Sequence, residues 1–331
     1  MTGKLGRRRF IAITAVGAGL GLAFPPIRDG SAALHRWHGA ALGARAEIAL
    51  HHPDSTAAQR LIGACIDEIA RLEAIFSLYQ PGSALSRLNR DGRLVTPPFE
   101  LLELLTVARR ISDLTGGAFD VTVQPLWQLH AEHFGRAGAD SAGPPEAEVQ
   151  RAMKRVDHRA ILIDPAEIRL LRPGMALTLN GIAQGYITDR VADLLRGEGM
   201  TGVLIDLGEI RVLGRHPEGR PWRAGLADPH QRKRHLAKAE LVDAALATSS
   251  ARGTAFDATG RHHHLFDPST GRSARGTIQA SVLAPTATLA DALSTALMIL
   301  PPTDGREICR ATGASEAWLI SDTGRTLRWR G

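Results

Sequence analysis

Asp291 and Thr295 are the residues whose types and spacing point most directly to chemistry. They stand four positions apart in 289–297, an otherwise apolar stretch, so on a helix both side chains would lie on one face. A buried carboxylate without a partner is costly, and a hard cation completed by carbonyls, water and a phosphate would satisfy both oxygens. Oxygen-only ligands favour Mg²⁺. Equally consistent is that Asp291 caps a neighbouring loop and Thr295 bonds the carbonyl four residues before it.

A glycine-containing turn over 177–186 could bind phosphate. Gly181 and Gly185 interrupt it just before a predicted helix over 185–198, and the amides and positive dipole of a helix start suit phosphate or pyrophosphate. The turn has neither the Gly-Lys-Ser/Thr of a Walker loop nor the spacing of a dinucleotide fingerprint.

A second pair of glycines, Gly116 and Gly117, stands directly before Phe119 and Asp120. Glycine permits positive φ and close approach of the backbone to a ligand. The simpler interpretation, which the residues alone favour, is a helix stop followed by a strand.

Three consecutive histidines, His262, His263 and His264, precede an Asp267-Pro268 turn. Side chains alternate between the two faces of a strand, so on a strand the three rings could not face one metal. A zinc triad is therefore not expected, and a single functional histidine beside the turn is.

The elements that must position these residues are short strands interrupted by helices. A first strand is predicted over 41–50, a helix capped by Ser55 follows it, a helix over 99–114 is ended by the glycine pair, and 131–147 is predicted to be a surface loop. Further helices are predicted over 185–198, 289–300 and 304–312, and strands over 160–164, 167–171, 175–180, 203–207, 210–214, 222–226, 238–243, 277–284 and 315–321.

Tight Asp-Pro and Arg-Pro-Gly turns between these strands indicate antiparallel hairpins. A doubly wound fold would need a helix after almost every strand. The predicted class is α+β, with mixed or antiparallel sheets and packed helices in one compact unit of two subregions.

Composition bounds the function. The 331 residues are 44% hydrophobic and 22% charged, with a net charge of +6, which indicates a globular chain rather than a disordered one. Most of this net charge comes from residues 1–30, and basic and acidic residues are interleaved along the rest of the chain, so nucleic-acid binding is not expected. Cys65 and Cys309 are too few for a disulfide framework; two buried thiols is the simpler interpretation, and one disulfide is the alternative.

Residues 1–30 have the pattern of an export signal. Arg7-Arg8-Arg9 precede a mildly apolar, Gly- and Ala-rich segment that ends at Pro25-Pro26, and paired arginines before such a segment resemble a twin-arginine (Tat) signal. We therefore expect a periplasmic protein with its functional domain over 31–331. No multi-span membrane protein is indicated. The signal could be cleaved or kept as an anchor, so membrane association would come only through it or through a partner.

Seven segments, taken together and in order between Leu42 and Leu300, resemble the ApbE family, the FAD:protein FMN transferases. The segments are Phe76-Ser77-Leu78-Tyr79 with Ser83, Leu88 and Asn89; Gly117-Ala118-Phe119-Asp120; Gly181-Ile182-Ala183-Gln184-Gly185-Tyr186; Leu207-Gly208-Glu209-Ile210-Arg211; Ala247-Thr248-Ser249; His264-Leu265-Phe266-Asp267-Pro268-Ser269-Thr270-Gly271; and Ala284-Pro285-Thr286 through Asp291 to Thr295.

The resemblance implies that FAD and Mg²⁺ bind in a cleft and that the FMN half of FAD passes to a threonine or serine hydroxyl of a target flavoprotein, releasing AMP. It implies that the carbonyl of Gly181 with Asp291 and Thr295 holds the metal. His264 could deprotonate the hydroxyl or stabilise the leaving phosphate. The implied FAD-site residues are Leu42, Tyr79, Ala118, Phe119, Asp120, Thr178, Gln184 and Leu265.

The sequence departs from the family at three places. Thr178 stands where an acidic residue is usual, Gln184 stands where a lysine or glutamate is usual, and a Leu-Gly-Gly-Asp segment is shortened to Leu207-Gly208-Glu209. Thr178 and Gln184 keep open the alternative of a non-catalytic FAD-binding chaperone or scaffold. An FAD pyrophosphatase is a further alternative, because water could replace the acceptor hydroxyl in the same site. The segment 178–186 with the Tat-like signal resembles the NosX branch, associated with nitrous oxide respiration, whose acceptor would be the membrane flavoprotein NosR.

Overall fold

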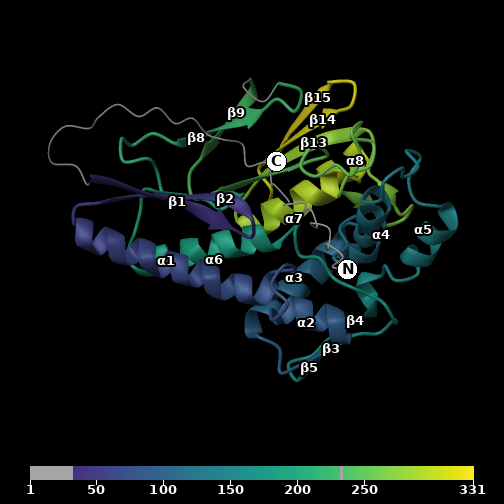
Figure 1. Ribbon diagram of the computed structural model, residues 1–331. Coiled ribbons are helices and arrows are strands. Elements are labelled where there is room, and N and C mark those ends of the chain that lie inside the picture. The colour runs from purple at the N-terminus through teal and green to yellow at the C-terminus, as the bar shows by residue number, and fades with distance from the viewer. Residues whose placement is uncertain (1–32, 232–233) are drawn as a thin grey trace, which may run out of the picture.

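An eight-stranded sheet forms the frame of the protein (Figure 1). The computed structural model describes residues 33–231 and 234–331. Every neighbouring pair of strands in this sheet is antiparallel, which confirms the predicted α+β class. The order is β1 (Ala33–Ala41), β2 (Ala44–His52), β6 (Val203–Asp206), β7 (Ile210–Leu213), β10 (Ala245–Ser250), β13 (Thr277–Ala284), β14 (Glu316–Ser321) and β15 (Thr326–Arg330).

Three helices cover one face of the sheet. They are α1 (Ser55–Phe76), α6 (Ala183–Gly197) and α7 (Ala287–Leu297). Helix α1 packs against β1 and β2, α6 packs against β6 and β7, and α7 packs against β10 and β13 (Figure 1). Burying a leucine or isoleucine contributes roughly 1.5–3 kcal/mol, so the apolar faces of these helices hold the layer together.

The opposite face of the sheet is covered by a hairpin of β8 (Trp222–Ala227) and β9 (His235–Leu241). Trp222 of the hairpin packs with Leu246 of β10 and Trp318 of β14 in one buried apolar cluster. The central strands are therefore buried on both faces, which explains why β7 is buried at every position.

A second subregion packs against one end of this layer. It contains a small sheet in the order β3-β5-β4 and the short helix η1 (His158–Ala160). Its other elements are α2 (Ala84–Asp91), β3 (Arg93–Val95), α3 (Phe99–Leu114), α4 (Gln124–Phe134), α5 (Glu146–Met153), β4 (Ile161–Ile163) and β5 (Glu167–Leu170). The C-terminal part adds β11 (Phe266–Asp267), β12 (Arg272–Ser273) and α8 (Pro302–Thr312).

Several predicted elements need correction. Ser55 is not the cap of α1, because Asp54 accepts hydrogen bonds from the amides of Thr56 and Ala57 (2.8 and 3.2 Å). Residues 175–180 form no strand, and α4 and α5 extend into the predicted loop over 131–147. The three histidines lie in a loop rather than on a strand, apart from one isolated bridge between His263 and Ala255.

Three further expectations concern the termini, membranes and cysteines. The predicted export signal lies outside the described residues. Within 33–231 and 234–331 we find no helix with the length and hydropathy needed to cross a bilayer. Cys65 and Cys309 are both buried free thiols, so the disulfide alternative is wrong. Burial raises the pKa of Cys65 to about 12 and that of Cys309 to about 11, which keeps both thiols protonated.

Candidate functional site

A cavity opens where the second subregion meets the helical layer. All twelve residues predicted for the site line the cavity: Leu42, Tyr79, Ala118, Phe119, Asp120, Thr178, Gly181, Gln184, His264, Leu265, Asp291 and Thr295.

Helix α7 carries Asp291 into the cavity. The helix begins after Thr286, whose hydroxyl accepts a hydrogen bond from the amide of Leu289 (3.3 Å). Asp189 of α6 adds a second cap, because its carboxylate accepts from the amides of Ala287 and Thr288, both at 2.8 Å. The hydroxyl of Thr286 and the carboxylate of Asp189 therefore both cap the first turn of α7, one turn before Asp291.

Asp291 is only 3% exposed, and its Oδ2 accepts a hydrogen bond from the amide of Gly185 (3.1 Å) at the start of α6. The alternative drawn from the sequence, that Asp291 caps a neighbouring segment, is thus part of the arrangement. One carboxylate oxygen is used in this way. Burial, together with the nearby charge of Asp189, raises the pKa of Asp291 to about 7 against the opposing hydrogen bond from Gly185.

Thr295 and Gly181 lie together beside Asp291. A Cβ placed on Gly181 would come within 2.8 Å of the Thr295 hydroxyl, so only glycine permits this approach. The hydroxyl also lies 3.2 Å from that of Ser249 on β10. Gly181, Asp291 and Thr295 therefore line one part of the cavity.

Glu209 is a buried acidic residue of the cavity that the analysis of residue types did not single out. It follows the turn between β6 and β7, is 7% exposed, and its Oε2 has no hydrogen-bond partner among the described residues. Burial and the like charges of Asp291 and Asp206 raise the pKa of Glu209 well above its usual value. The signal in the sequence was a pair of carboxylates, Asp206 and Glu209, in the largely apolar run 203–213.

Backbone contacts hold the cavity wall formed by Ala118–Val121, which we call the pocket wall. The amide of Phe119 donates to the hydroxyl of Thr115 (3.1 Å), and the amide of Thr178 donates to the carbonyl of Val121 (2.8 Å). Gly116 and Gly117 before the wall have φ of 59° and 87°, a conformation that favours glycine. The glycine pair therefore ends α3 and also turns the chain into the wall.

The start of α6 offers fewer free amides than the sequence predicted. The amides of Ile182 and Ala183 both donate to the carbonyl of Leu179 (3.0 and 2.7 Å), and that of Gly185 donates to Asp291. The expectation of an amide cradle for phosphate at this helix start is therefore wrong for these three groups. Gln184 points toward Gly208, where a Cβ would meet its side-chain nitrogen at 2.7 Å.

The three histidines point to different surroundings, as expected. His262 packs with Phe134, at 4.8 Å between ring centroids, and His263 lies 3.0 Å from the carbonyl of Ala274. Only His264 lines the cavity.

The Nδ1 of His264 lies 3.1 Å from the carbonyl of Thr254. The amide of Thr254 also lies 3.3 Å from this nitrogen, so Nδ1 donates to the carbonyl or accepts from the amide according to the tautomer of the ring. Burial lowers the pKa of His264 to about 4, so the ring is neutral near pH 7.

The donors in this part of the cavity fit a hard cation. They are all oxygens, and the two buried carboxylates, Asp291 and Glu209, repel each other without a basic side chain between them among the cavity-lining residues. A divalent cation would relieve that repulsion. In the described part of the chain no three His, Cys, Asp or Glu residues form a metal-binding group, so hydroxyl, carbonyl and ligand oxygens would have to complete the coordination.

Comparisons with known proteins agree with this geometry. The sequence model of the ApbE family matches residues 42–319. The chain is 32% identical over 245 residues to an FAD:protein FMN transferase of Vibrio cholerae serotype O1, covering 71% of this chain and 72% of that protein. It is 26% identical over 264 residues to the FAD:protein FMN transferase of Escherichia coli K12, covering 77% and 75%.

Two crystal structures have the same fold. The ApbE protein of Thermotoga maritima superposes with a TM-score of 0.78 at 27% identity, covering 89% of this chain and 97% of that one. The apo form of the flavinyl transferase ApbE of Pseudomonas stutzeri gives a TM-score of 0.78 at 25% identity, covering 92% and 96%.

Proposed function

Because this chain belongs to the ApbE family and is an FAD:protein FMN transferase, we propose that it works with Mg²⁺, which Asp291, Thr295 and the carbonyl of Gly181 would hold. The observation that carries the proposal is the pair of buried carboxylates, Asp291 and Glu209, in a cavity lined by oxygen donors. When bound, the metal would stabilise negative charge that develops on the pyrophosphate of FAD.

The reaction exchanges one phosphorus–oxygen bond for another. A threonine or serine hydroxyl of the acceptor attacks the phosphorus on the FMN side of the pyrophosphate, and the bond from that phosphorus to the bridging oxygen breaks. AMP leaves with the bridging oxygen. The acceptor gains a phosphoester bond to FMN.

His264 would take the proton of the attacking hydroxyl. Its ring lines the cavity, and its lowered pKa keeps the ring neutral near pH 7. Proton removal by a positioned base typically contributes 10²- to 10⁴-fold to the rate. His264 is therefore proposed as the general base, and the pocket wall with Tyr79, Thr178 and Leu265 as the surface that holds FAD.

The acceptor and the location are proposed from the N-terminal sequence. A Tat-like segment in residues 1–30 supports export to the periplasm, so the acceptor would be an exported or membrane flavoprotein. The resemblance of 178–186 to the NosX branch supports a NosR-type flavoprotein of nitrous oxide respiration as that acceptor. Mass spectrometry of candidate exported flavoproteins, from cells with and without this protein, should find FMN on a threonine or serine only when it is present.

Product analysis tests the activity directly. Purified protein with FAD, Mg²⁺ and an acceptor domain should release AMP and flavinylate the acceptor in equal amounts, and EDTA should stop both. Free FMN with AMP in the absence of acceptor would indicate a pyrophosphatase. Stoichiometric FAD binding without AMP would indicate a chaperone or scaffold, and either result with the correct acceptor present would contradict the proposal.

A further inference from the structure

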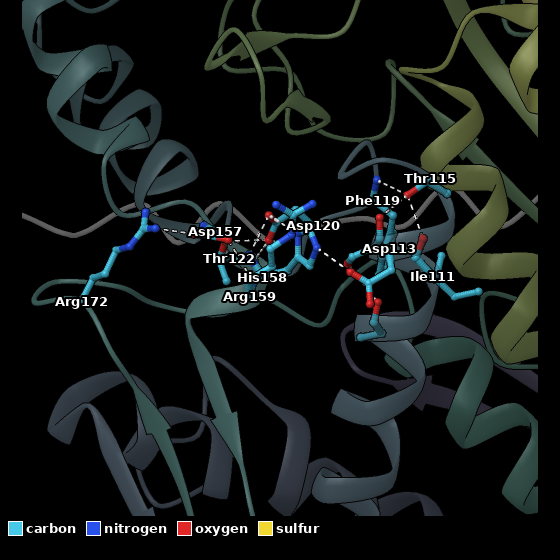
Figure 2. Close-up of polar contacts among 12 residues, drawn as sticks. Ile111, Asp113, Thr115, Phe119, Asp120, Thr122, Asp157, His158, Arg159 and Arg172 are labelled. Carbon is cyan, nitrogen blue, oxygen red and sulfur yellow. Dashed lines mark hydrogen bonds and ion pairs between the residues drawn. The ribbon is translucent and has the colours of Figure 1, made fainter.

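A histidine between two carboxylates stands behind the pocket wall. His158 in η1 is 6% exposed. Its Nδ1 lies 3.4 Å from Oδ2 of Asp120, and its Nε2 lies 3.1 Å from Oδ1 of Asp113 (Figure 2). Asp113 belongs to α3 and Asp120 to the pocket wall, so the ring joins a helix of the second subregion to the surface that lines the cavity.

The two contacts define the charge of the ring. An ionised carboxylate only accepts hydrogen bonds, so each ring nitrogen that faces one must carry a proton. A ring protonated on both nitrogens is an imidazolium. The hydrogen bond to Asp120 raises the pKa of His158, and the charges of Asp120 and Asp113 raise it further against the opposing effect of burial.

Asp120 is fully engaged in holding the wall. Its Oδ1 accepts from the amide and the hydroxyl of Thr122 (2.7 and 2.6 Å), and its Oδ2 accepts from the amide of His158 (3.1 Å) in addition to the ring. A carboxylate with four donors has little capacity left for a ligand. Asp120 therefore acts on the cavity through the backbone that it fixes.

The other charged residues near His158 in the sequence and on neighbouring segments are Asp157, Arg159 and Arg172. Asp157, next to His158, forms an ion pair with Arg172, and its amide donates to the hydroxyl of Thr122 (2.8 Å). Arg159 follows on the same short helix. The charges that act on the ring are those of Asp120 and Asp113, and both favour its protonated form.

Two contacts described above link the wall to its surroundings: the amide of Phe119 donates to the hydroxyl of Thr115, and the amide of Thr178 donates to the carbonyl of Val121. Phe119 and Thr178 both line the cavity. The ring also lies next to Gly117, where a Cβ would be at ordinary van der Waals distance (3.7 Å) from Cε1 of His158.

We propose that His158 is a positioning residue: as an imidazolium bridging Asp113 and Asp120 it fixes the pocket wall, and the affinity of the cavity for FAD falls when the ring loses its proton. The choice of FAD as the ligand rests on the proposed function. The sign follows from the direction of the shift. A histidine with a raised pKa contributes its interaction fully below the ordinary pKa and loses it as the pH rises through the raised value.

The test is FAD affinity as a function of pH, measured by quenching of flavin fluorescence between pH 6 and pH 9.5 without metal or acceptor. As His158 loses its proton, the affinity of the wild-type protein for FAD should fall about tenfold, which corresponds to about 1.4 kcal/mol of binding free energy. His158→Asn keeps a donor toward Asp120 but cannot titrate, so its profile should lack the His158 step and keep only the change that comes from the raised pKa values of Asp291 and Glu209. His235→Gln, an exposed histidine of the β8/β9 hairpin, is the matched control and should keep the wild-type profile.

Asp113→Asn separates positioning by charge from a merely structural role. The Asp113 side chain is 57% exposed, so the variant should fold, and the loss of one carboxylate should move the midpoint of the affinity profile to lower pH. Nuclear magnetic resonance titration of the His158 ring should show the same downward shift without FAD. An unchanged midpoint, or a pH-dependent loss of affinity in His158→Asn equal to that of the wild type, would overturn the proposal.

The ring titration also separates this proposal from the proposed function. If the protein bound no FAD at any pH, the proposed function and the effect on affinity would both be wrong, while the shift in Asp113→Asn would still decide whether the bridge exists. If FMN transfer occurred but affinity showed no step that depends on His158, only this inference would fail.

Discussion

Gly185 in α6 and Ala287 in α7 approach so closely that a Cβ on Gly185 would lie 2.3 Å from the carbonyl oxygen of Ala287. The atoms it would meet belong to the backbone, so no side-chain rotation could make room. The same approach brings the amide of Gly185 to the carboxylate of Asp291. The crossing of the two helices and the place of Asp291 therefore depend on the absence of one methyl group.

Gly185→Ala should separate α6 from α7. We expect the free energy of unfolding to fall by about 3 kcal/mol, the upper range for inserting a group into packed structure, as measured by urea denaturation followed by circular dichroism. Gly197→Ala at the other end of α6 has open space around the new methyl and should change the stability by less than about 1 kcal/mol. If Gly185→Ala were as stable as the wild-type protein, the close approach of α6 and α7 would not contribute to stability.

Asp291→Asn should abolish stabilisation by Mg²⁺. At a metal concentration one hundred times Kd, a ligand that binds only the folded state adds about 2.7 kcal/mol to stability, and this should appear as a higher Tm of the wild-type protein in Mg²⁺ than in EDTA. The variant keeps an oxygen for the amide of Gly185 but loses the charge, so the two Tm values should coincide. Asp193→Asn, on the exposed face of α6, should respond as the wild type does. A full Mg²⁺ response in Asp291→Asn would refute the proposed cation site.

Glu209→Gln should stabilise the metal-free protein. The change removes a buried charge that faces Asp291, while the amide oxygen can still accept the hydrogen bond from the backbone of Thr248. We expect a gain of about 1–3 kcal/mol at pH 7.5 in EDTA, because an unpaired buried charge is costly. The gain should shrink when Mg²⁺ is added to both proteins. Glu240→Gln on β9, where the side chain is 58% exposed, should alter stability by less than about 0.5 kcal/mol.

The pH dependence of transfer should reflect the lowered pKa of His264. With a pKa of about 4, the base form is present from about pH 5 upward, so the rate should not fall near pH 6.5 as it would for an unperturbed imidazole. His264→Gln should lower kcat by 10²- to 10⁴-fold with little change in FAD affinity. A wild-type rate that halves near pH 6.5 under saturating substrate would contradict this assignment.

Local periodicity and turn residues were enough to predict much of the fold. The strand over 277–284 and the helix over 99–114 have the predicted bounds, because each has a strong apolar pattern and a clear stop. Helix α4 was missed because the β-branched residues just before Gln124-Pro125 suggested a strand, although a proline at the start of a helix is itself a start signal.

The segment 175–180 shows why alternation alone can mislead. Met175, Leu177 and Leu179 alternate and are all buried, as in a strand. The amide of Leu177 instead donates to the side chain of Asn89 (2.6 Å), and Asn89 donates back to the carbonyl of Leu177 (2.8 Å). An asparagine side chain thus replaces a neighbouring strand, and a partner 88 positions away cannot be inferred from local pattern.

The cavity also contains features that the sequence predicts and features that it does not. Motifs in chain order were enough to name twelve of its residues, whereas the Asp113–His158–Asp120 bridge and the free oxygen of Glu209 depend on contacts between distant segments. Nothing in the residue types around His158 distinguishes it from the twelve other histidines of the chain.

Asp189 joins helices α6 and α7 in the protein without ligand, which affects the free energy of binding. It belongs to α6, yet it caps α7 through the amides of Ala287 and Thr288, so the segments that carry Gly181 and Asp291 are joined before any ligand arrives. An incoming nucleotide then meets a preorganised surface and need not offset the conformational entropy of bringing two distant stretches of chain together. Selectivity at this place is therefore decided during folding rather than by closure around the ligand.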